Sequence, residues 1–156
     1  MTALVVAVLD AAFAIAYYWN VLGAAIVGRV FRSIAAGWLG KAAYAGGPEV
    51  IALGVVSHYV VALAWTLSYL LIVRKLPLVA QMVRTAGGQV AVGTAFGLLG
   101  YLMMDFVILP LSRAAPLAPG SWRFYGMVVW HMIGVGLPIV LFTERAPARV
   151  RALAAS

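Results

Sequence analysis

Four long stretches of this chain carry almost no charged side chain, and this pattern limits the fold more than any other feature of the sequence. They cover about residues 3–28, 50–73, 90–112 and 124–143, and the charged residues inside them are Asp10 and Asp105. Each stretch reaches the roughly 20 residues that a helix rising about 1.5 Å per residue needs to cross about 30 Å of hydrocarbon. The pattern therefore predicts four membrane-spanning helices.

The composition and the continuity of these stretches favour helices over a membrane β-barrel. Hydrophobic residues make up 65% of the 156 residues and charged residues 10%, against about 25% charged residues in an ordinary soluble domain. Barrel strands alternate apolar and polar positions, whereas these runs are continuous, and a helix pairs its own backbone groups inside lipid. The expected fold class is all-α, an integral membrane four-transmembrane-helix bundle in which residues 1–156 form a single membrane domain.

The segment between the first two spans, residues 29–45, has the pattern of an amphipathic helix. Arg29, Ser33 and Lys41 lie near one helical face, and Phe31 and Trp38 lie near the other. This indicates a short interfacial helix in the headgroup layer. A re-entrant segment is the alternative, because four glycines between residues 37 and 47 make the chain easy to bend. Residues 144–156 form a basic, alanine-rich tail that we expect to lie along the headgroups.

The net charge of +7 comes from lysines and arginines at helix ends and in loops rather than from a continuous patch. This distribution favours membrane lipids as partners, and we expect no nucleic-acid partner. The side of the membrane that holds both termini, side A, carries six basic residues, and the opposite side, side B, carries five. By the positive-inside rule, this difference predicts that both termini are cytoplasmic. The side A residues are Arg74, Lys75, Arg84, Arg145, Arg149 and Arg151, and the side B residues are Arg29, Arg32, Lys41, Arg113 and Arg123.

Four ionisable side chains lie inside the expected spans, where polar groups are costly and usually face the bundle interior. His58 and His131 lie eight and seven residues inside spans that run in the same direction, and Asp105 lies seven residues before the end of a span that runs the opposite way. At about 1.5 Å per residue, all three lie roughly 10–12 Å below side B. We therefore expect His58, Asp105 and His131 to share one polar layer. Asp10 is expected near side A, in a different layer, as a candidate proton entry point.

One ligand that fits such a layer is a b-type haem. Neutral imidazoles of His58 and His131 would bind its iron axially, and Gly54, Gly97 and Gly134 would leave room for the porphyrin. A Soret band that is lost in His58→Ala and His131→Ala would identify this cofactor.

The same layer could instead hold a metal ion through His58, His131 and Asp105, or bind a proton, a quinone or a lipid-like ligand. Tyr101 lies one turn before Asp105 on the same helical face and is a further ligand-binding candidate. A structural alternative is that these groups hydrogen-bond one another as helix glue, worth about 1 kcal/mol. For the whole protein, the alternative is a noncatalytic accessory subunit of a larger membrane complex, or a homo-oligomer. No motif assigns an enzymatic reaction or a catalytic residue.

Several stretches are similar to those of a known group of proteins. They are Ser33-Ile-Ala-Ala-Gly-Trp-Leu-Gly-Lys-Ala-Ala followed by Gly46-Gly47, Leu53-Gly-Val-Val-Ser-His58-Tyr, Tyr101-Leu-Met-Met-Asp105-Phe-Val-Ile-Leu-Pro110-Leu-Ser112, and His131-Met through Gly136-Leu-Pro138-Ile. They resemble small uncharacterised bacterial four-span membrane proteins, loosely YagU-like. The resemblance covers most of the chain and implies a bacterial inner-membrane location, without an established activity. In similar chains the Asp105 position is often Asn, which weakens any mechanism that needs a carboxylate there.

Overall fold

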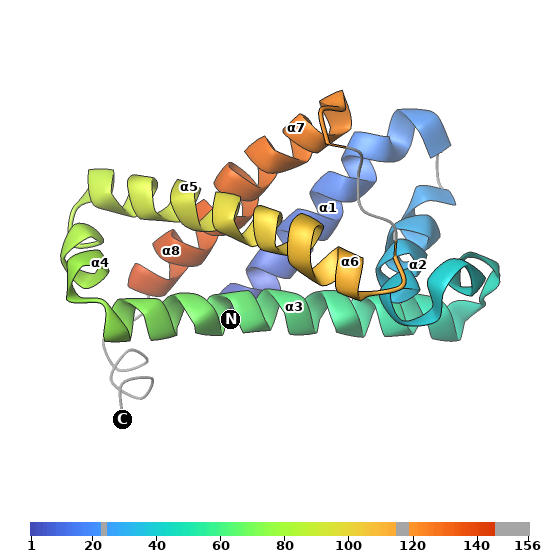
Figure 1. The fold of residues 1–156 in the computed structure, drawn as a ribbon, viewed down its shortest axis with the longest axis horizontal. Coiled ribbons are helices and arrows are strands. Elements are labelled where there is room, and N and C mark those ends of the chain that lie inside the picture. The colour runs from blue at the N-terminus through green and yellow to red at the C-terminus, as the bar shows by residue number, and fades with distance from the viewer. Residues whose placement is uncertain (23–24, 115–118, 146–156) are drawn as a thin grey trace.

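A computed structural model describes residues 1–22, 25–114 and 119–145 of the chain, and in these residues it contains helices and no strand (Figure 1). This confirms the predicted all-α fold class. The residues beyond 145, most of the predicted basic tail, lie outside the described part. The elements are α1 (Thr2–Leu22), α2 (Ile26–Leu39), the 3₁₀ helix η2 (Gly40–Ala45), α3 (Pro48–Lys75), α4 (Pro77–Met82), α5 (Ala86–Met103), η3 (Met104–Ile108), α6 (Leu109–Leu111), α7 (Trp122–Trp130), η4 (His131–Gly136) and α8 (Leu137–Glu144).

Four continuous helical stretches are long and apolar enough to cross a membrane, which confirms the predicted four-helix bundle and a multi-pass membrane protein. They are Thr2–Trp19, Pro48–Lys75, Ala86–Leu111 and Trp122–Glu144. The first span is shorter than the expected residues 3–28, because a new helix, α2, begins at Ile26. Hydropathy alone does not register a helix end inside an apolar run, so the last residues of that run were assigned to the wrong helix.

Two of the spans contain a π-helical turn directly before a proline. The turn η3 precedes Pro110, and the turn η4 precedes Pro138. Proline has no N–H to donate and its ring clashes with the carbonyl four residues earlier, so the backbone widens locally instead of continuing as an α-helix. Both wide turns begin at or beside an ionisable residue, since η3 contains Asp105 and η4 starts at His131.

The segment between the first two spans forms α2 and η2, and α2 packs against the first turns of α3 (Figure 1). The backbone of Phe31 occupies the space beside Gly54. Two side chains tie the segments together: Arg32 Nε donates to the Gly46 carbonyl at 2.8 Å, and Trp38 Nε1 donates to Ser57 Oγ at 3.0 Å. The helix exists as predicted over most of residues 29–45. Its position in the headgroup layer, rather than as a re-entrant segment, stays a prediction.

The third and fourth spans approach each other through glycine. A Cβ atom on Gly97 would overlap the His131 carbonyl, and a Cβ on Gly136 would overlap the backbone of Gly93 and Gly97. Small residues permit such backbone contact, and inside lipid close packing is a main source of helix association. Any larger residue at these positions would push α5 and η4 apart.

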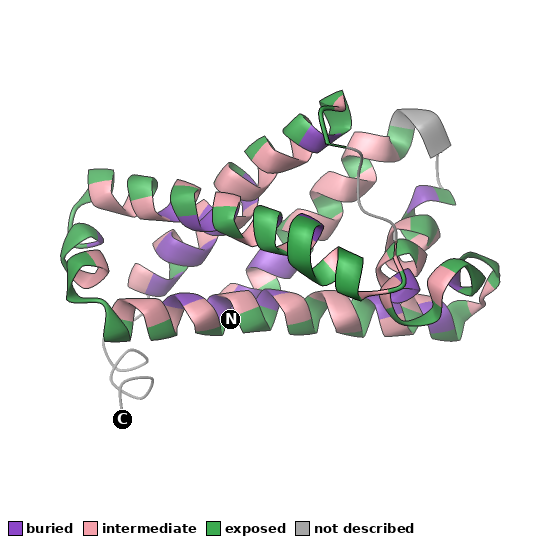
Figure 2. Cartoon of the chain, viewed as in Figure 1, coloured by how far each residue is buried: buried purple, intermediate pink, exposed green. Residues whose placement is uncertain are grey.

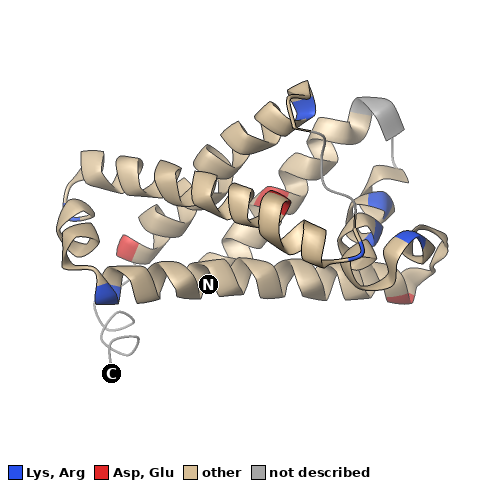
Figure 3. Cartoon of the chain, viewed as in Figure 1, with Lys and Arg blue, Asp and Glu red and all other residues tan. Residues whose placement is uncertain are grey.

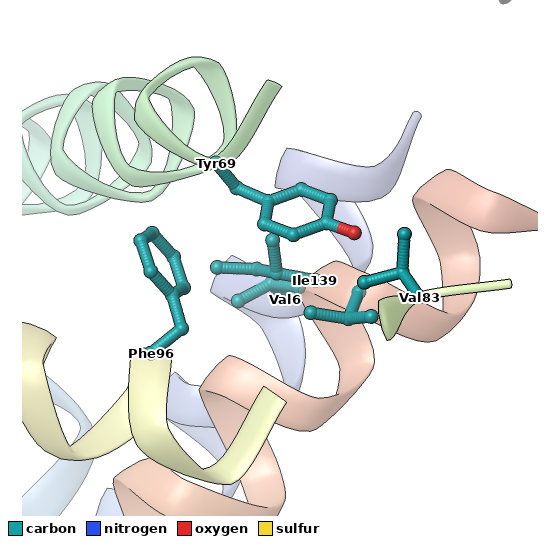
Figure 4. Close-up of a cluster of buried hydrophobic side chains, with 6 residues drawn as sticks. Val6, Tyr69, Val83, Phe96 and Ile139 are labelled. Atoms are coloured by element: carbon teal, nitrogen blue, oxygen red, sulfur yellow. The ribbon is translucent and has the colours of Figure 1, made fainter. Parts of the chain in front are cut away.

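By contrast, α3 meets α5 through large aromatic side chains. The Trp65 and Phe96 rings lie 5.6 Å apart between centroids, and the Tyr69 and Phe96 rings lie 5.8 Å apart. Figure 4 shows Tyr69 and Phe96 in one buried cluster with Val6, Val83 and Ile139, which come from three other parts of the chain. Away from this cluster, many large apolar residues are exposed, as expected of a surface that is solvated by lipid, and Figure 2 shows exposed positions along every long helix.

We expect Gly97→Ala to destabilise the bundle by about 1–3 kcal/mol, because the added methyl group meets the His131 backbone and forces the helices apart. The measurement is the free energy of unfolding in mild detergent. Gly87→Ala is the matched control, since a Cβ at Gly87 has no other atom within 4 Å in the described structure. Equal loss of stability in both variants would contradict the packing contact described above.

Candidate functional site

A cavity of about 1340 Å³ lies among the helices, and its lining comes from all four spans and from α2. Ligand pockets for small molecules usually measure about 300–1,000 Å³, so this cavity is large enough for a long molecule. Most of its surface is apolar. The carboxylate and imidazole groups that line it inside the spans are those of Asp10, His58 and His131.

Asp10 and His58 form the polar centre of the cavity wall. The Nε2 atom of His58 lies 3.9 Å from Asp10 Oδ2 and 2.9 Å from the carbonyl oxygen of Ala7. The other carboxylate oxygen, Oδ1, accepts a hydrogen bond of 2.8 Å from Trp130 Nε1. The Trp130 indole is itself fixed by stacking on Phe13, with ring centroids 3.8 Å apart. These contacts join α1, α3 and α7 inside the membrane.

The hydrogen bonds of the two histidines assign their neutral tautomers. A carbonyl oxygen only accepts, so His58 carries its proton on Nε2, which donates to Ala7, and His131 carries its proton on Nδ1, which donates to Met127 at 2.8 Å. The remaining ring nitrogens, His58 Nδ1 and His131 Nε2, are therefore acceptors. Each can accept a hydrogen bond from a hydroxyl group of a ligand, or accept a proton.

Tyr101 and Asp105 lie in the bundle but do not line this cavity. The Tyr101 ring is buried against Phe124 and His131, with centroid distances of 5.3 Å and 5.0 Å. Asp105 is also buried, with 4% of its surface exposed. Of the predicted ligand-binding residues, the structure therefore brings His58 and His131 to the cavity and leaves Tyr101 and Asp105 behind its wall.

The predicted depth of Asp10 was wrong, because Asp10 lies beside His58 rather than in a separate layer near side A. The estimate assumed that every span begins at the membrane surface. However, α1 has 21 residues and α3 has 28, so the two helices cannot share both ends. The polar layer thus contains Asp10 beside His58.

The structure does not assemble the predicted metal ligands. In residues 1–22, 25–114 and 119–145, no group of three His, Asp or Glu side chains lies close enough to hold a metal ion. His58, His131 and Asp105 are separated because Asp105 lies outside the cavity that the two histidines line.

The predicted room for a porphyrin is also filled. His58 Nε2 is engaged with the Ala7 carbonyl, and the space beside each of the three glycines that were expected to make room is occupied by other atoms. The groups that occupy the space are the Phe31 backbone at Gly54, the His131 backbone at Gly97 and the Trp130 indole at Gly134. These positions offer no support for haem binding.

Two features of the site were missed in the sequence. Trp130 was not singled out, although an indole N–H in the middle of an apolar span needs an acceptor, and that requirement was a usable signal. Arg29, Arg113 and Arg123 were counted only as charges that flank the helices, yet all three line the cavity. Their convergence depends on how three separate segments fold together, so the sequence carried no comparable signal for it.

We expect Trp130→Phe to lower the free energy of unfolding by about 1 kcal/mol, the usual size of a hydrogen bond between membrane helices. The phenyl ring keeps the stacking on Phe13 but removes the N–H that Asp10 accepts. Trp122→Phe, an exposed position on the same helix, is the control. If both variants unfold alike in mild detergent, the bond between Trp130 and Asp10 does not hold the helices together.

Comparison with known proteins finds no relative: no family model, no curated protein and no solved structure matches this chain.

Proposed function

We propose that this protein binds a lipid-like molecule inside the membrane, in the cavity that Asp10, His58 and His131 line. The observation that carries the proposal is the cavity itself, about 1340 Å³ of mostly apolar surface within a four-span bundle. Its size and lining fit a long apolar molecule better than a compact polar substrate.

The membrane environment supports a bound apolar molecule. An empty apolar cavity forfeits van der Waals contacts along its whole lining, whereas an acyl or isoprenoid chain restores them. In the membrane, lipid surrounds the four spans, so acyl chains are always available to enter the cavity. The aromatic contacts of Phe96 with Trp65 and Tyr69 favour a lasting cavity, because rigid rings separate α3 from α5.

The polar side chains in the cavity wall can discriminate between ligands. His58 and His131 present ring acceptors, and Asp10 presents a carboxylate that Trp130 holds in place beside His58. A hydroxyl group on an otherwise apolar molecule would satisfy one of these acceptors. A proton carried by Asp10 or His58, as the sequence suggested, remains compatible with the same arrangement.

Gly100→Phe should reduce the amount of co-purified lipid several-fold. Gly100 lines the cavity, and a Cβ atom there would make ordinary contact with the Trp65 ring at 3.7–3.9 Å, so a larger side chain can enter the cavity without displacing backbone. The measurement is native mass spectrometry after purification in mild detergent. Gly87→Phe adds the same side chain at a position with open space and does not line the cavity, so it should retain the lipid.

Two outcomes would count against lipid binding. Lipid-free wild-type protein would contradict it directly. A larger protein that co-purifies in fixed ratio, and whose binding is lost in Gly100→Phe, would instead identify an accessory subunit whose partner fills the cavity.

We also propose that the chain lies in a bacterial inner membrane with both termini in the cytoplasm, as its charge distribution and its resemblance to YagU-like proteins suggest. The protein contains no cysteine, so single cysteines report the orientation directly. Ala42→Cys, in η2, should react with a membrane-impermeant maleimide on intact cells, and Gln81→Cys, in α4, should react only after the cells are opened. The reverse pattern would place both termini outside.

A further inference from the structure

Three arginines from separate segments line the cavity, and all belong to side B. Arg29 comes from α2, Arg113 follows α6, and Arg123 lies in the first turn of α7. The side A cations Arg74, Lys75 and Arg84 do not line it. Figure 3 shows basic residues at α2 and at the start of α7, and others at the far end of the molecule around the end of α3 and α4. The cavity therefore joins an apolar interior to a cationic end.

Aromatic rings hold two of these guanidinium groups in position. Arg29 lies over the Tyr44 ring at 5.4 Å from its centroid, and Arg123 lies over Tyr18 and Trp122 at 5.8 Å and 5.7 Å. A guanidinium that stacks on a ring face keeps its N–H groups, which point outward in its own plane, available to an acceptor. The contacts that the structure shows for the Arg29 and Arg123 heads are thus with aromatic rings.

Arg32 shows how a basic side chain on the same helix is used differently. Its Nε atom donates to the Gly46 carbonyl, and its positive charge attracts the Glu49 carboxylate. Arg32 does not line the cavity. Arg29 and Arg32 lie three residues apart on α2, yet Arg29 lines the cavity and Arg32 does not. The positive charge at the cavity therefore comes from particular side chains and not from α2 as a whole.

We propose that the cavity binds a phospholipid with a net negative headgroup, with the headgroup on the side B lining that carries Arg29, Arg113 and Arg123 and one acyl chain in the apolar interior. This inference rests on the proposed lipid-binding function and names its ligand class. The planar fork of arginine matches phosphate oxygens. A zwitterionic headgroup brings its own cation towards the three arginines, and that like charge disfavours it.

The only carboxylate among the described cavity-lining residues fixes the direction of the lipid. Asp10 lies beside His58 and accepts from Trp130, which is seven residues after Arg123 on α7 and so about 10 Å further along that helix. A phosphate near Asp10 would meet like charge, whereas a phosphate at the arginines meets opposite charge. The acyl chain therefore points towards Asp10 and His58.

The test is a competition between two lipids that differ only in headgroup. Wild-type protein in mild detergent receives equal amounts of phosphatidylglycerol and phosphatidylcholine with identical acyl chains, and native mass spectrometry counts the bound molecules. We expect phosphatidylglycerol to be bound in excess by about fivefold or more, the ratio that a single nearby arginine can supply. Equal binding of the two lipids would overturn the headgroup assignment and leave lipid binding intact. No binding of either lipid would overturn the proposed function itself.

A matched pair of triple variants tests the residues. R29Q/R113Q/R123Q should lose the preference for phosphatidylglycerol while it still binds phosphatidylcholine, because the apolar interior is unchanged. R74Q/K75Q/R84Q removes the same total charge from side A and should keep the preference. If R74Q/K75Q/R84Q loses as much of the preference for phosphatidylglycerol as R29Q/R113Q/R123Q does, the effect comes from net charge, and the arginine site is refuted.

Discussion

The close contact between the third and fourth spans is the constraint on which the rest of this structure depends. Gly93, Gly97 and Gly136 leave no space for a Cβ atom, so α5 and η4 touch through their backbones. Helices in lipid gain little from burying apolar surface, since the lipid is equally apolar, and such close packing supplies much of the attraction. The contact also fixes where His131 lies, because its own carbonyl oxygen is part of the contact.

The other side of α5 meets its neighbour through large side chains, and this difference explains the cavity. Trp65 and Tyr69 place aromatic rings between α3 and α5, whereas the contact between the third and fourth spans is made by glycines. A bundle that is tight on one side and held apart by rings on the other leaves an apolar space between its helices. The ligand-binding proposal and the arginine proposal both depend on this asymmetry in residue size.

The polar residues follow a different rule, because a polar group in hydrocarbon needs a partner. Asp10 meets that need through Trp130, and the histidines meet it through carbonyl oxygens. These bonds satisfy the groups and also leave one acceptor nitrogen on each imidazole. The same arrangement therefore stabilises the bundle and equips the cavity wall, so structural and binding roles of His58 are not exclusive.

The sequence by itself determined the helical class, the four spans and the inward position of His58 and His131, because length, continuity and the cost of polar groups in lipid are local properties. It could not determine that Asp10 lies level with His58, since depth counted along one helix ignores how far that helix is shifted along its neighbour. It also could not show that three arginines from separate segments line one cavity. Those facts depend on the relative placement of helices, which only the glycine contacts and aromatic rings of the tertiary structure decide.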